Sequence, residues 1–364
     1  MATSSKFPIN VLVVDDSAVT RIYLVHLLES DPQIRVIGKV SSGQSALDFI
    51  KEQAPDAVLM DINMPGMDGF EATRRIMETQ PLPIIICTAA MNPREVATTF
   101  RMLEAGAVAC LEKPGSREHP DFAALSANLL QTIKLMSEVK VVRRWPRSRQ
   151  TEALMPAARL IEAKSPPAGI KLIGMGASTG GPAVLQTILA SLPKNFPVPI
   201  LIVQHIAPGF LAGLTEWLNQ TTGLQIQIAA YGTSPLPGHV YLAPDDFHLG
   251  ISSNGRLLLT KEDAENGLRP AVSYLFRSLA QLYGSGAVGV LLTGMGKDGA
   301  AELKLMKDRG AITLAQDRES SVVHGMPGEA IALGGATHVL SADKIADLLA
   351  AVVSRQNGQG GSEL

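Results

Sequence analysis

Short apolar runs recur along most of this chain, and most of them end at a polar residue or at a turn rich in glycine or proline. In the first part of the chain, five such runs alternate with helix-like segments: Asn10–Val14, Ile34–Val40, Ala57–Met60, Ile84–Cys87 and Val108–Leu111. Apolar runs of this length, separated by helices, are typical of a parallel sheet that is covered on both faces. A long helix is expected to close this part, from about residue 121 to 141.

The alternation resumes near residue 170. The expected strands are Lys171–Met175, Pro199–Val203, Ala287–Leu292, Ala311–Leu314 and His338–Leu340, with a hairpin-like stretch over His239–Thr260. Helices are expected between them, for example over 271–283 and 300–309. The sequence therefore predicts an α/β protein with two doubly wound parallel sheets, a flavodoxin-like five-stranded domain and a larger Rossmann-like domain.

The domain boundaries follow from shifts in composition. We expect a first domain over 8–141, a linker over 142–168, a second domain over 169–355 and a flexible tail over 356–364. The linker is rich in arginine and proline, and its middle part, 151–163, is compatible with a short helix. The tail is rich in glycine and serine, as frayed chain ends often are.

Composition excludes several classes of protein. Of the 364 residues, 46% are hydrophobic and 18% are charged, which fits two packed cores and not a disordered chain. A net charge of -2 gives no bulk attraction to nucleic acid or to an anionic membrane. No apolar run approaches the ~20 residues that span a bilayer, and Met1–Pro8 carries no apolar signal core. We therefore expect a cytoplasmic protein without nucleic-acid binding or direct membrane insertion.

Polar residues follow the expected strands of the first domain. Asp15 and Asp16 follow the first strand, Asp61 the third, Thr88 the fourth and Lys113 the fifth. Right-handed crossovers bring these strand ends to one edge of the sheet, where three carboxylates need a cation. Oxygen-only ligation by Asp15, Asp16 and Asp61 suits Mg²⁺. A carboxylate can also attack phosphorus to form an acyl phosphate, whose oxygens Thr88 and Lys113 would hold.

For a lone aspartate, the simpler interpretation is that Asp15 or Asp16 caps the helix beginning at Ser17. The ordered set, with Met64–Gly69 after Asp61, resembles the receiver domain of response regulators over roughly residues 8 to 140. The resemblance implies that Asp61 accepts a phosphoryl group from a histidine kinase while Asp15 and Asp16 help to hold Mg²⁺. One departure is Cys110, which stands where many receivers carry an aromatic switch residue.

The second domain opens with Gly176-Ala177-Ser178-Thr179-Gly180. A dinucleotide fingerprint fails because Thr179 stands where the third glycine belongs, and a P-loop fails because Pro182 replaces the lysine. The match is to G-x-S-x-G, a strand-to-helix turn that exposes a serine. The alternative is that Ser178 only caps the helix that follows.

A histidine and an aspartate complete the set of polar residues at strand ends. His205 follows Ile200–Gln204, and Asp298 follows the run that begins at Val290. With Ser178 they supply the parts of a hydrolytic triad. Sequence spacing leaves alternatives open: Asp298 only caps the helix at Ala300, or other residues in turn-like contexts take these roles, namely His248, His324, Asp245, Asp246 and Asp317.

The chain order Ser, His, Asp argues against the α/β-hydrolase fold, in which the acid precedes the histidine. The segments 173–182, 203–206, 289–300 and 316–327 resemble the chemotaxis protein-glutamate methylesterase family, CheB. The resemblance implies a receiver domain followed by a methylesterase domain, with Ser178 as nucleophile, His205 as general base and Asp298 as the orienting acid. No cofactor is expected at the esterase site.

The same resemblance implies the substrate and the regulation. Glutamyl methyl esters of methyl-accepting chemotaxis receptors would be hydrolysed, with deamidation of receptor glutamines as a compatible second activity. The unphosphorylated receiver would cover the esterase cleft, and phosphorylation of Asp61 would open it. Departures at Asp245, Ala271, Ser273, Lys297 and His324 leave the cognate receptor open. The competing hypotheses are a response regulator with a non-catalytic binding output, and an esterase of a non-chemotaxis signalling protein.

Overall fold

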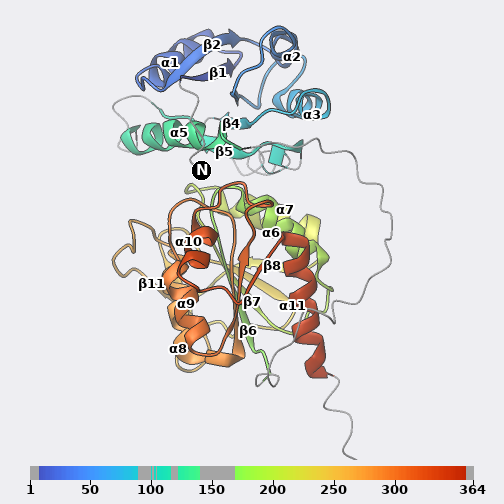
Figure 1. Cartoon of the computed structure of the whole chain (residues 1–364), viewed down its shortest axis with the longest axis vertical. Helices are drawn as coiled ribbons and strands as arrows, with labels where there is room; N and C mark the ends of the chain where they lie inside the picture. Colours follow the sequence, from blue (N-terminus) through green and yellow to red (C-terminus); the bar gives the residue numbers. More distant parts are fainter. Residues whose placement is uncertain are drawn as a thin grey trace, which may run out of the picture. The chain divides into compact units, whose positions relative to one another are not determined.

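The computed structural model describes residues 8–88, 100, 102–103, 105–115, 122–139 and 169–357. The chain divides into two compact units, Met1–Thr151 and Glu152–Leu364 (Figure 1). The expected linker, with its short helix, and residues 358–364 of the expected tail lie outside the described residues. The tail prediction is wrong at its start, because helix α11 (Ala342–Asn357) continues past residue 356.

The first unit contains a five-stranded parallel sheet in the order β2-β1-β3-β4-β5, which confirms the flavodoxin-like prediction. Both β3 and β4 are buried along their whole length, as strands are when helices cover both faces of a sheet. The strands are β1 (Ile9–Val14), β2 (Ile34–Val40), β3 (Ala57–Met60), β4 (Ile84–Thr88) and β5 (Ala109–Glu112). The described helices are α1 (Ala18–Leu28), α2 (Gly43–Glu52), α3 (Gly69–Thr79) and α5 (Phe122–Met136).

The second unit contains a seven-stranded parallel sheet in the order β14-β13-β12-β6-β7-β9-β8. After β6, the chain first adds β7, β8 and β9 on one side of this strand. It then crosses to the other side and adds β12, β13 and β14, so the topological switch point lies at β6. The strands are β6 (Leu172–Ala177), β7 (Ile200–Gln204), β8 (Gln225–Ile228), β9 (His239–Leu242), β12 (Ala287–Leu291), β13 (Ile312–Gln316) and β14 (His338–Leu340). The helices are α6 (Gly181–Ser191), α7 (Leu211–Thr222), α8 (Val272–Leu282), the 3-10 turn η2 (Gly284–Gly286), α9 (Ala300–Asp308), α10 (Met326–Ala332) and α11. In open α/β sheets, ligands bind beyond the carboxyl ends of the strands at such a switch point.

The hairpin expected over His239–Thr260 is only partly correct. β9 pairs in parallel with β7 and β8 and so belongs to the main sheet. The antiparallel pair is β10 (His248–Ile251) with β11 (Leu257–Thr260), and it forms a separate two-stranded sheet.

Close packing between α8 and β6 sets the position of the start of α8. A Cβ atom on Gly176 would lie 2.3 Å from Val272 Cγ1, and one on Gly174 would lie 2.5 Å from Leu279 Cδ1. A larger residue at either position in β6 would force the facing side chain of α8, Val272 or Leu279, to shift. The two glycines therefore allow the N-terminus of α8 to approach the carboxyl ends of the central strands.

Candidate active site and phosphorylation site

The Asp298 side chain lies at the N-terminus of α8. Val272 N donates to its Oδ2 at 2.6 Å and Ser273 N donates to its Oδ1 at 3.1 Å. Free amide groups at the first turn of a helix stabilise a carboxylate. Asp298 is only 2% exposed, and burial opposes ionisation. The His205 ring and the hydrogen bonds from Ser273 and Val272 outweigh burial, so that the pKa of Asp298 is lowered.

His205 faces this carboxylate from the end of β7. Its Nε2 lies 3.0 Å from Asp298 Oδ2, and its main-chain N–H donates to Ala177 O at 2.9 Å. The ring N–H direction is not aligned with the carboxylate, and catalytic contacts of this kind commonly tighten when substrate binds. Because Nε2 faces Asp298, Nδ1 is the ring nitrogen left for another partner.

Ser178 follows β6, the strand next to β7. Its N–H donates to Thr293 O at 3.0 Å, just beyond β12, and its carbonyl accepts from Gly181 N at 2.8 Å. The alternative that Ser178 caps α6 is wrong, because the N-cap is Gly180 in the left-handed conformation with φ 77°. No hydrogen bond joins the side chains of Ser178 and His205, both of which the structure describes.

The three candidate residues of the sequence pattern therefore lie at one edge of the sheet, beyond three adjacent strands. Asp298 does not cap α9 either, since Gly299 is the N-cap of that helix. A serine hydroxyl, an imidazole and a buried ionised carboxylate at one sheet edge are the groups that nucleophilic acyl transfer requires.

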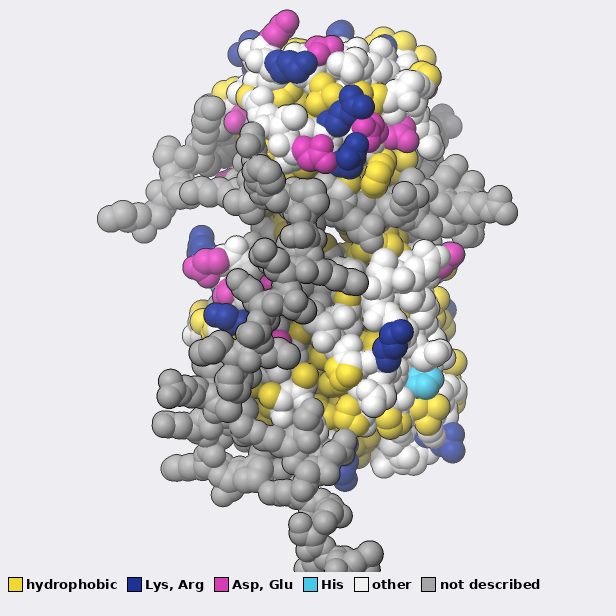
Figure 2. All heavy atoms as spheres, turned by 90° about the vertical axis from the view of Figure 1, so that its right-hand side faces the viewer, with side chains coloured by type: hydrophobic (Ala, Val, Ile, Leu, Met, Phe, Trp, Pro, Cys, Tyr) yellow, Lys and Arg dark blue, Asp and Glu magenta, His cyan; other side chains and the backbone are white. Residues whose placement is uncertain are grey.

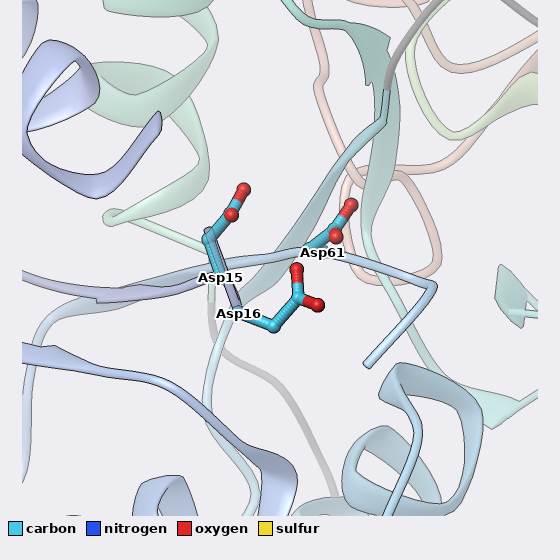
Figure 3. Close-up of side chains that lie close together, drawn as sticks. All are labelled: Asp15, Asp16 and Asp61. Atoms are coloured by element: carbon cyan, nitrogen blue, oxygen red, sulfur yellow. The ribbon is translucent and has the colours of Figure 1, made fainter. Parts of the chain in front are cut away.

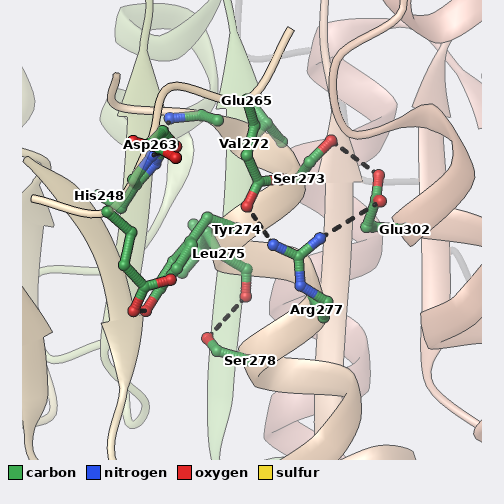
Figure 4. Close-up of polar contacts among 12 residues, drawn as sticks. His248, Asp263, Glu265, Val272, Ser273, Tyr274, Leu275, Arg277, Ser278 and Glu302 are labelled. Carbon is green, nitrogen blue, oxygen red and sulfur yellow. Dashed lines mark hydrogen bonds and ion pairs between the residues drawn. The ribbon is translucent and has the colours of Figure 1, made fainter. Parts of the chain in front are cut away.

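The strongest rival histidine, His248, has both ring nitrogens occupied. Ala271 N donates to Nδ1 at 3.2 Å, so the proton is on Nε2, which lies 3.1 Å from Asp263 O. The ring is fully buried and stacks on Tyr274 with centroids 4.8 Å apart (Figure 4). Both ring nitrogens of the buried His248 are therefore used in contacts with nearby main-chain groups.

The remaining rivals make contacts elsewhere. Asp317 accepts from Ser320 N at 2.9 Å, and Asp246 accepts from Arg269 Nε at 2.9 Å. Asp245 accepts from Gly209 N at 3.1 Å.

The other rival histidine, His324, lies 3.3 Å from Ser321 Oγ, and burial lowers the pKa of its ring. In the described ranges, Asp298 is the acidic residue that forms an ion-pair contact with His205.

A chain of polar contacts that begins at the buried Ser273 supports the loop next to Asp298, and Figure 4 shows its side chains. Ser273 Oγ accepts from Gly299 N at 2.9 Å and donates to Glu302 Oε2 at 2.7 Å. Arg277 Nη1 lies 3.7 Å from Glu302 Oε1 and pairs with Glu265 through Nη2. Sequence reasoning missed this chain, because its members come from three segments with no shared motif.

The carboxylates of the first unit converge as expected. One carboxylate oxygen from each of Asp15, Asp16 and Asp61 lies within 4.8 Å of the others (Figure 3). Lys113 Nζ lies 2.7 Å from Asp15 Oδ2 and 2.8 Å from Asp61 Oδ1. An all-oxygen set with one exposed member, Asp16, fits Mg²⁺, which keeps several waters and takes few carboxylates.

Burial and the neighbouring charges act on this cluster in opposite directions. Burial raises the pKa of Asp61 more than Lys113 lowers it, and the Asp15 charge adds to the increase. Burial opposes the charge of Lys113, but contacts with Asp15 and Asp61 outweigh it and raise the lysine pKa. Thr88 ends β4 and is 3% exposed, and its carbonyl accepts from Lys113 N at 2.8 Å.

The capping alternative for the two N-terminal aspartates is wrong. The N-cap of α1 is Ser17, whose hydroxyl accepts from Thr20 N at 3.3 Å. Asp15 Oδ1 accepts from Ser17 N at 2.9 Å, which orients the turn and leaves Oδ2 to face Lys113.

Comparison with known proteins gives a matching family model for each of the two units. A family model described as CheB methylesterase matches residues 173–349, and one described as response regulator receiver domain matches residues 11–121. A protein-glutamate methylesterase/protein-glutamine glutaminase of Nitrosospira multiformis is 51% identical over 350 residues, covering 96% of this chain and 98% of that protein. A protein-glutamate methylesterase/protein-glutamine glutaminase 1 of Syntrophus aciditrophicus is 52% identical over 341 residues, covering 94% of this chain and 97% of that protein. This chain belongs to the CheB family.

The CheB assignment confirms the predicted combination of a receiver and a methylesterase domain. A solved CheB methylesterase catalytic domain of Thermotoga maritima is 43% identical, with 51% of this chain and 100% of that chain covered and a TM-score of 0.49. Among the described residues, no helix of this CheB is both long and apolar enough to cross a membrane. Figure 2 shows lysine and arginine side chains scattered singly over the described surface of the second unit on that side.

Cys110, the departure from the usual receiver pattern, does not bring a reactive thiolate to this CheB. Burial raises the pKa of its thiol, and burial raises the pKa of Cys87 to about 12. Buried thiols with raised pKa values are poor nucleophiles. Cys87 therefore behaves as a small apolar residue of the receiver core, while Cys110 is only partly buried.

Proposed function

We propose that this protein is a protein-glutamate methylesterase that acts on methyl-accepting chemotaxis receptors and is activated by phosphorylation of its receiver. The observation that carries the proposal is the contact of His205 Nε2 with Asp298 Oδ2 at 3.0 Å, beside the turn that carries Ser178. The names of the relatives point to the same reaction. Membership of the family supports the chemoreceptor substrate and the adaptation role.

The esterase step uses only side chains and amides of this chain. Ser178 Oγ attacks the carbonyl carbon of a glutamyl methyl ester while His205 Nδ1 accepts the hydroxyl proton. His205 then returns the proton to the departing methoxide, and methanol leaves an acyl-enzyme. Water, deprotonated by His205, then adds to the acyl carbon, and His205 returns this proton to Ser178 Oγ as the acyl–oxygen bond breaks and the glutamate product leaves. Asp298 stays ionised, holds the ring and stabilises the imidazolium.

The oxyanion of each tetrahedral intermediate needs nearby donors. Gly181 N already donates to Ser178 O, so the amides of Thr179 and Gly180 are the candidates in the turn after the nucleophile. Loss of one oxyanion donor typically costs about 2.7–4 kcal/mol of transition-state stabilisation. The same groups would serve the deamidation of a receptor glutamine, whose amide is a harder acyl donor.

In the receiver, Asp61 is the proposed phosphoryl acceptor and a chemotaxis histidine kinase the donor. Asp15, Asp16 and Asp61 would hold Mg²⁺, which when bound offsets the negative charge on the phosphoryl group. Lys113 and the Thr88 hydroxyl would contact phosphoryl oxygens. Phosphorylation converts the Asp61 partner of Lys113 into a dianion, and this change biases a two-state equilibrium that controls the esterase.

Covalent labelling tests the nucleophile without any knowledge of the receptor. The protein is incubated with a fluorophosphonate, and the labelled peptide is identified by mass spectrometry in wild type and in Ser178→Ala. The proposal predicts one labelled peptide, containing Ser178, that is absent from the variant. Folded wild type that stays unlabelled over hours would favour the non-catalytic binding output.

A further inference from the structure

Gln204, the last residue of β7, contacts the backbone of both the proposed nucleophile and the proposed base. Its side chain is only 5% exposed. Nε2 donates to Ser178 O at 2.9 Å and to His205 O at 2.8 Å. One planar amide therefore uses both of its N–H groups to join the turn after β6 to the turn after β7.

The orientation of this amide is determined by its partners. Both neighbours of Nε2 are carbonyl oxygens, which accept and cannot donate, so the reversed amide would place Oε1 against two acceptors. The space is equally restricted, because a Cβ atom on Gly181 would lie 2.1 Å from Gln204 Oε1. The absence of a side chain at Gly181 is what lets the glutamine lie in this place.

The placement matters because no direct hydrogen bond joins the side chains of Ser178 and His205, which both belong to the described residues. Their separation is set by the two turns that carry them. Strand pairing continues to Ala177 and Gln204, and His205 N donates to Ala177 O at 2.9 Å. Beyond that point, the Gln204 side chain is the group that contacts the main chain of both residues.

We infer that Gln204 is a positioning residue that sets the distance between the Ser178 hydroxyl and the His205 ring. This inference rests on the proposed function, since it takes Ser178 and His205 as the reacting pair. The role assigned to Gln204 acts through its contacts with Ser178 O and His205 O and includes no contact with the substrate. Its effect should fall on kcat, because misplacement of a catalytic group by about 1 Å can lower a rate about 100-fold.

The test compares full-length wild type with Gln204→Met and Gln204→Glu. Methionine removes both N–H donors at similar length, and glutamate of the same shape removes at least one of the two donors in either protonation state. Methanol release from a methylated receptor fragment gives kcat and KM, and fluorophosphonate labelling gives the reactivity of Ser178 directly. We expect kcat and the labelling rate to fall about 10- to 100-fold in both variants, with KM within about twofold.

Asn219→Leu is the matched control. Asn219 Nδ2 also donates to two main-chain carbonyls, Thr215 O at 3.1 Å and Ile226 O at 2.7 Å, but between α7 and β8. We expect this variant to lose thermal stability and keep kcat per folded molecule. If either Gln204 variant folds and keeps wild-type kcat and labelling, or if Asn219→Leu lowers kcat as much, the inference is overturned.

The two readouts separate this inference from the proposed function. Labelling of wild-type Ser178 without methanol release would overturn the ester substrate, while the labelling rates of the Gln204 variants still decide the role of Gln204. No labelling of folded wild type would overturn both proposals.

Discussion

The Asp298 carboxylate oxygen that lies next to the His205 ring also accepts a hydrogen bond of 2.6 Å from Val272 N, at the first turn of α8. The helix N-terminus and the imidazole thus act on the same oxygen. This arrangement keeps a nearly fully buried acid ionised, and only an ionised acid can stabilise the imidazolium that forms during ester hydrolysis.

Replacement of this acid tests its role in the reaction. We expect Asp298→Asn to lower kcat for methyl-ester hydrolysis by about 10³- to 10⁴-fold, because an amide does not stabilise the imidazolium. Steady-state methanol release is the measurement. Asp317→Asn is the matched control and should stay within a few-fold of wild type, since Asp317 contacts Ser320. Equal losses in the two variants would contradict the assignment.

The lowered pKa of Asp298 also predicts how stability depends on pH. The pKa is below its ordinary value of 3.8 in the folded state, so the ionised form stabilises the fold above that value. This contribution is lost as pH falls through the folded pKa. Chemical unfolding from pH 7 down to pH 3 should show wild type losing its stability advantage over Asp298→Asn below about pH 4. A difference that does not change over this range would refute the lowered pKa.

The pKa of Asp61 is shifted in the opposite direction to that of Asp298. Burial raises the pKa of Asp61 above 3.8 in the fold, so stability falls as pH rises from about 3.8 to the raised pKa and stays lower above it. We therefore expect Asp61→Asn to increase the free energy of unfolding of the receiver at pH 7 and to have little effect below about pH 4. The same variant should not respond to a small-molecule phosphodonor. A loss of stability at pH 7 would count against the raised pKa.

Variants of His205 and His248 should distinguish the proposed catalytic histidine from the histidine that supports the fold. His205→Asn should lower kcat by at least about 10³-fold with little change in the unfolding midpoint. His248→Asn should cost about 1–3 kcal/mol of unfolding free energy, because it leaves the Ala271 amide or the Asp263 carbonyl without its partner. Its kcat per folded molecule should stay within about threefold of wild type. If His248→Asn lowered kcat and His205→Asn lowered only stability, the two assignments would be contradicted.

Apolar runs were sufficient to predict most of the sheet strands. β2, β3 and β14 match the expected ranges in full. β3 is buried along its whole length and appears as a continuous apolar segment, whereas β2 and β14 are partly exposed edge strands. The edge strand β8 was missed because only Ile226 of its four residues is buried. The role of β9 was misjudged because periodicity does not show whether a strand pairs with its sequence neighbour or joins a distant sheet.

The candidate site could be predicted only in part. The positions of Ser178 and His205 at strand ends followed from their sequence context, and the structure brings both to the same edge. Choosing His205 over His248 required knowing that the His248 ring is buried with both nitrogens occupied. The support from Ser273 and Gln204 was not foreseen, because helix and strand patterns do not show which backbone groups a side chain will reach.

Methanol release from methylated chemoreceptor cytoplasmic fragments tests the central claim most directly. Wild type and Ser178→Ala are each assayed with and without a phosphodonor, after both are shown to be folded. The account predicts release by wild type alone and faster release with the phosphodonor. Absence of release from wild type in both states, across several receptors, would contradict it.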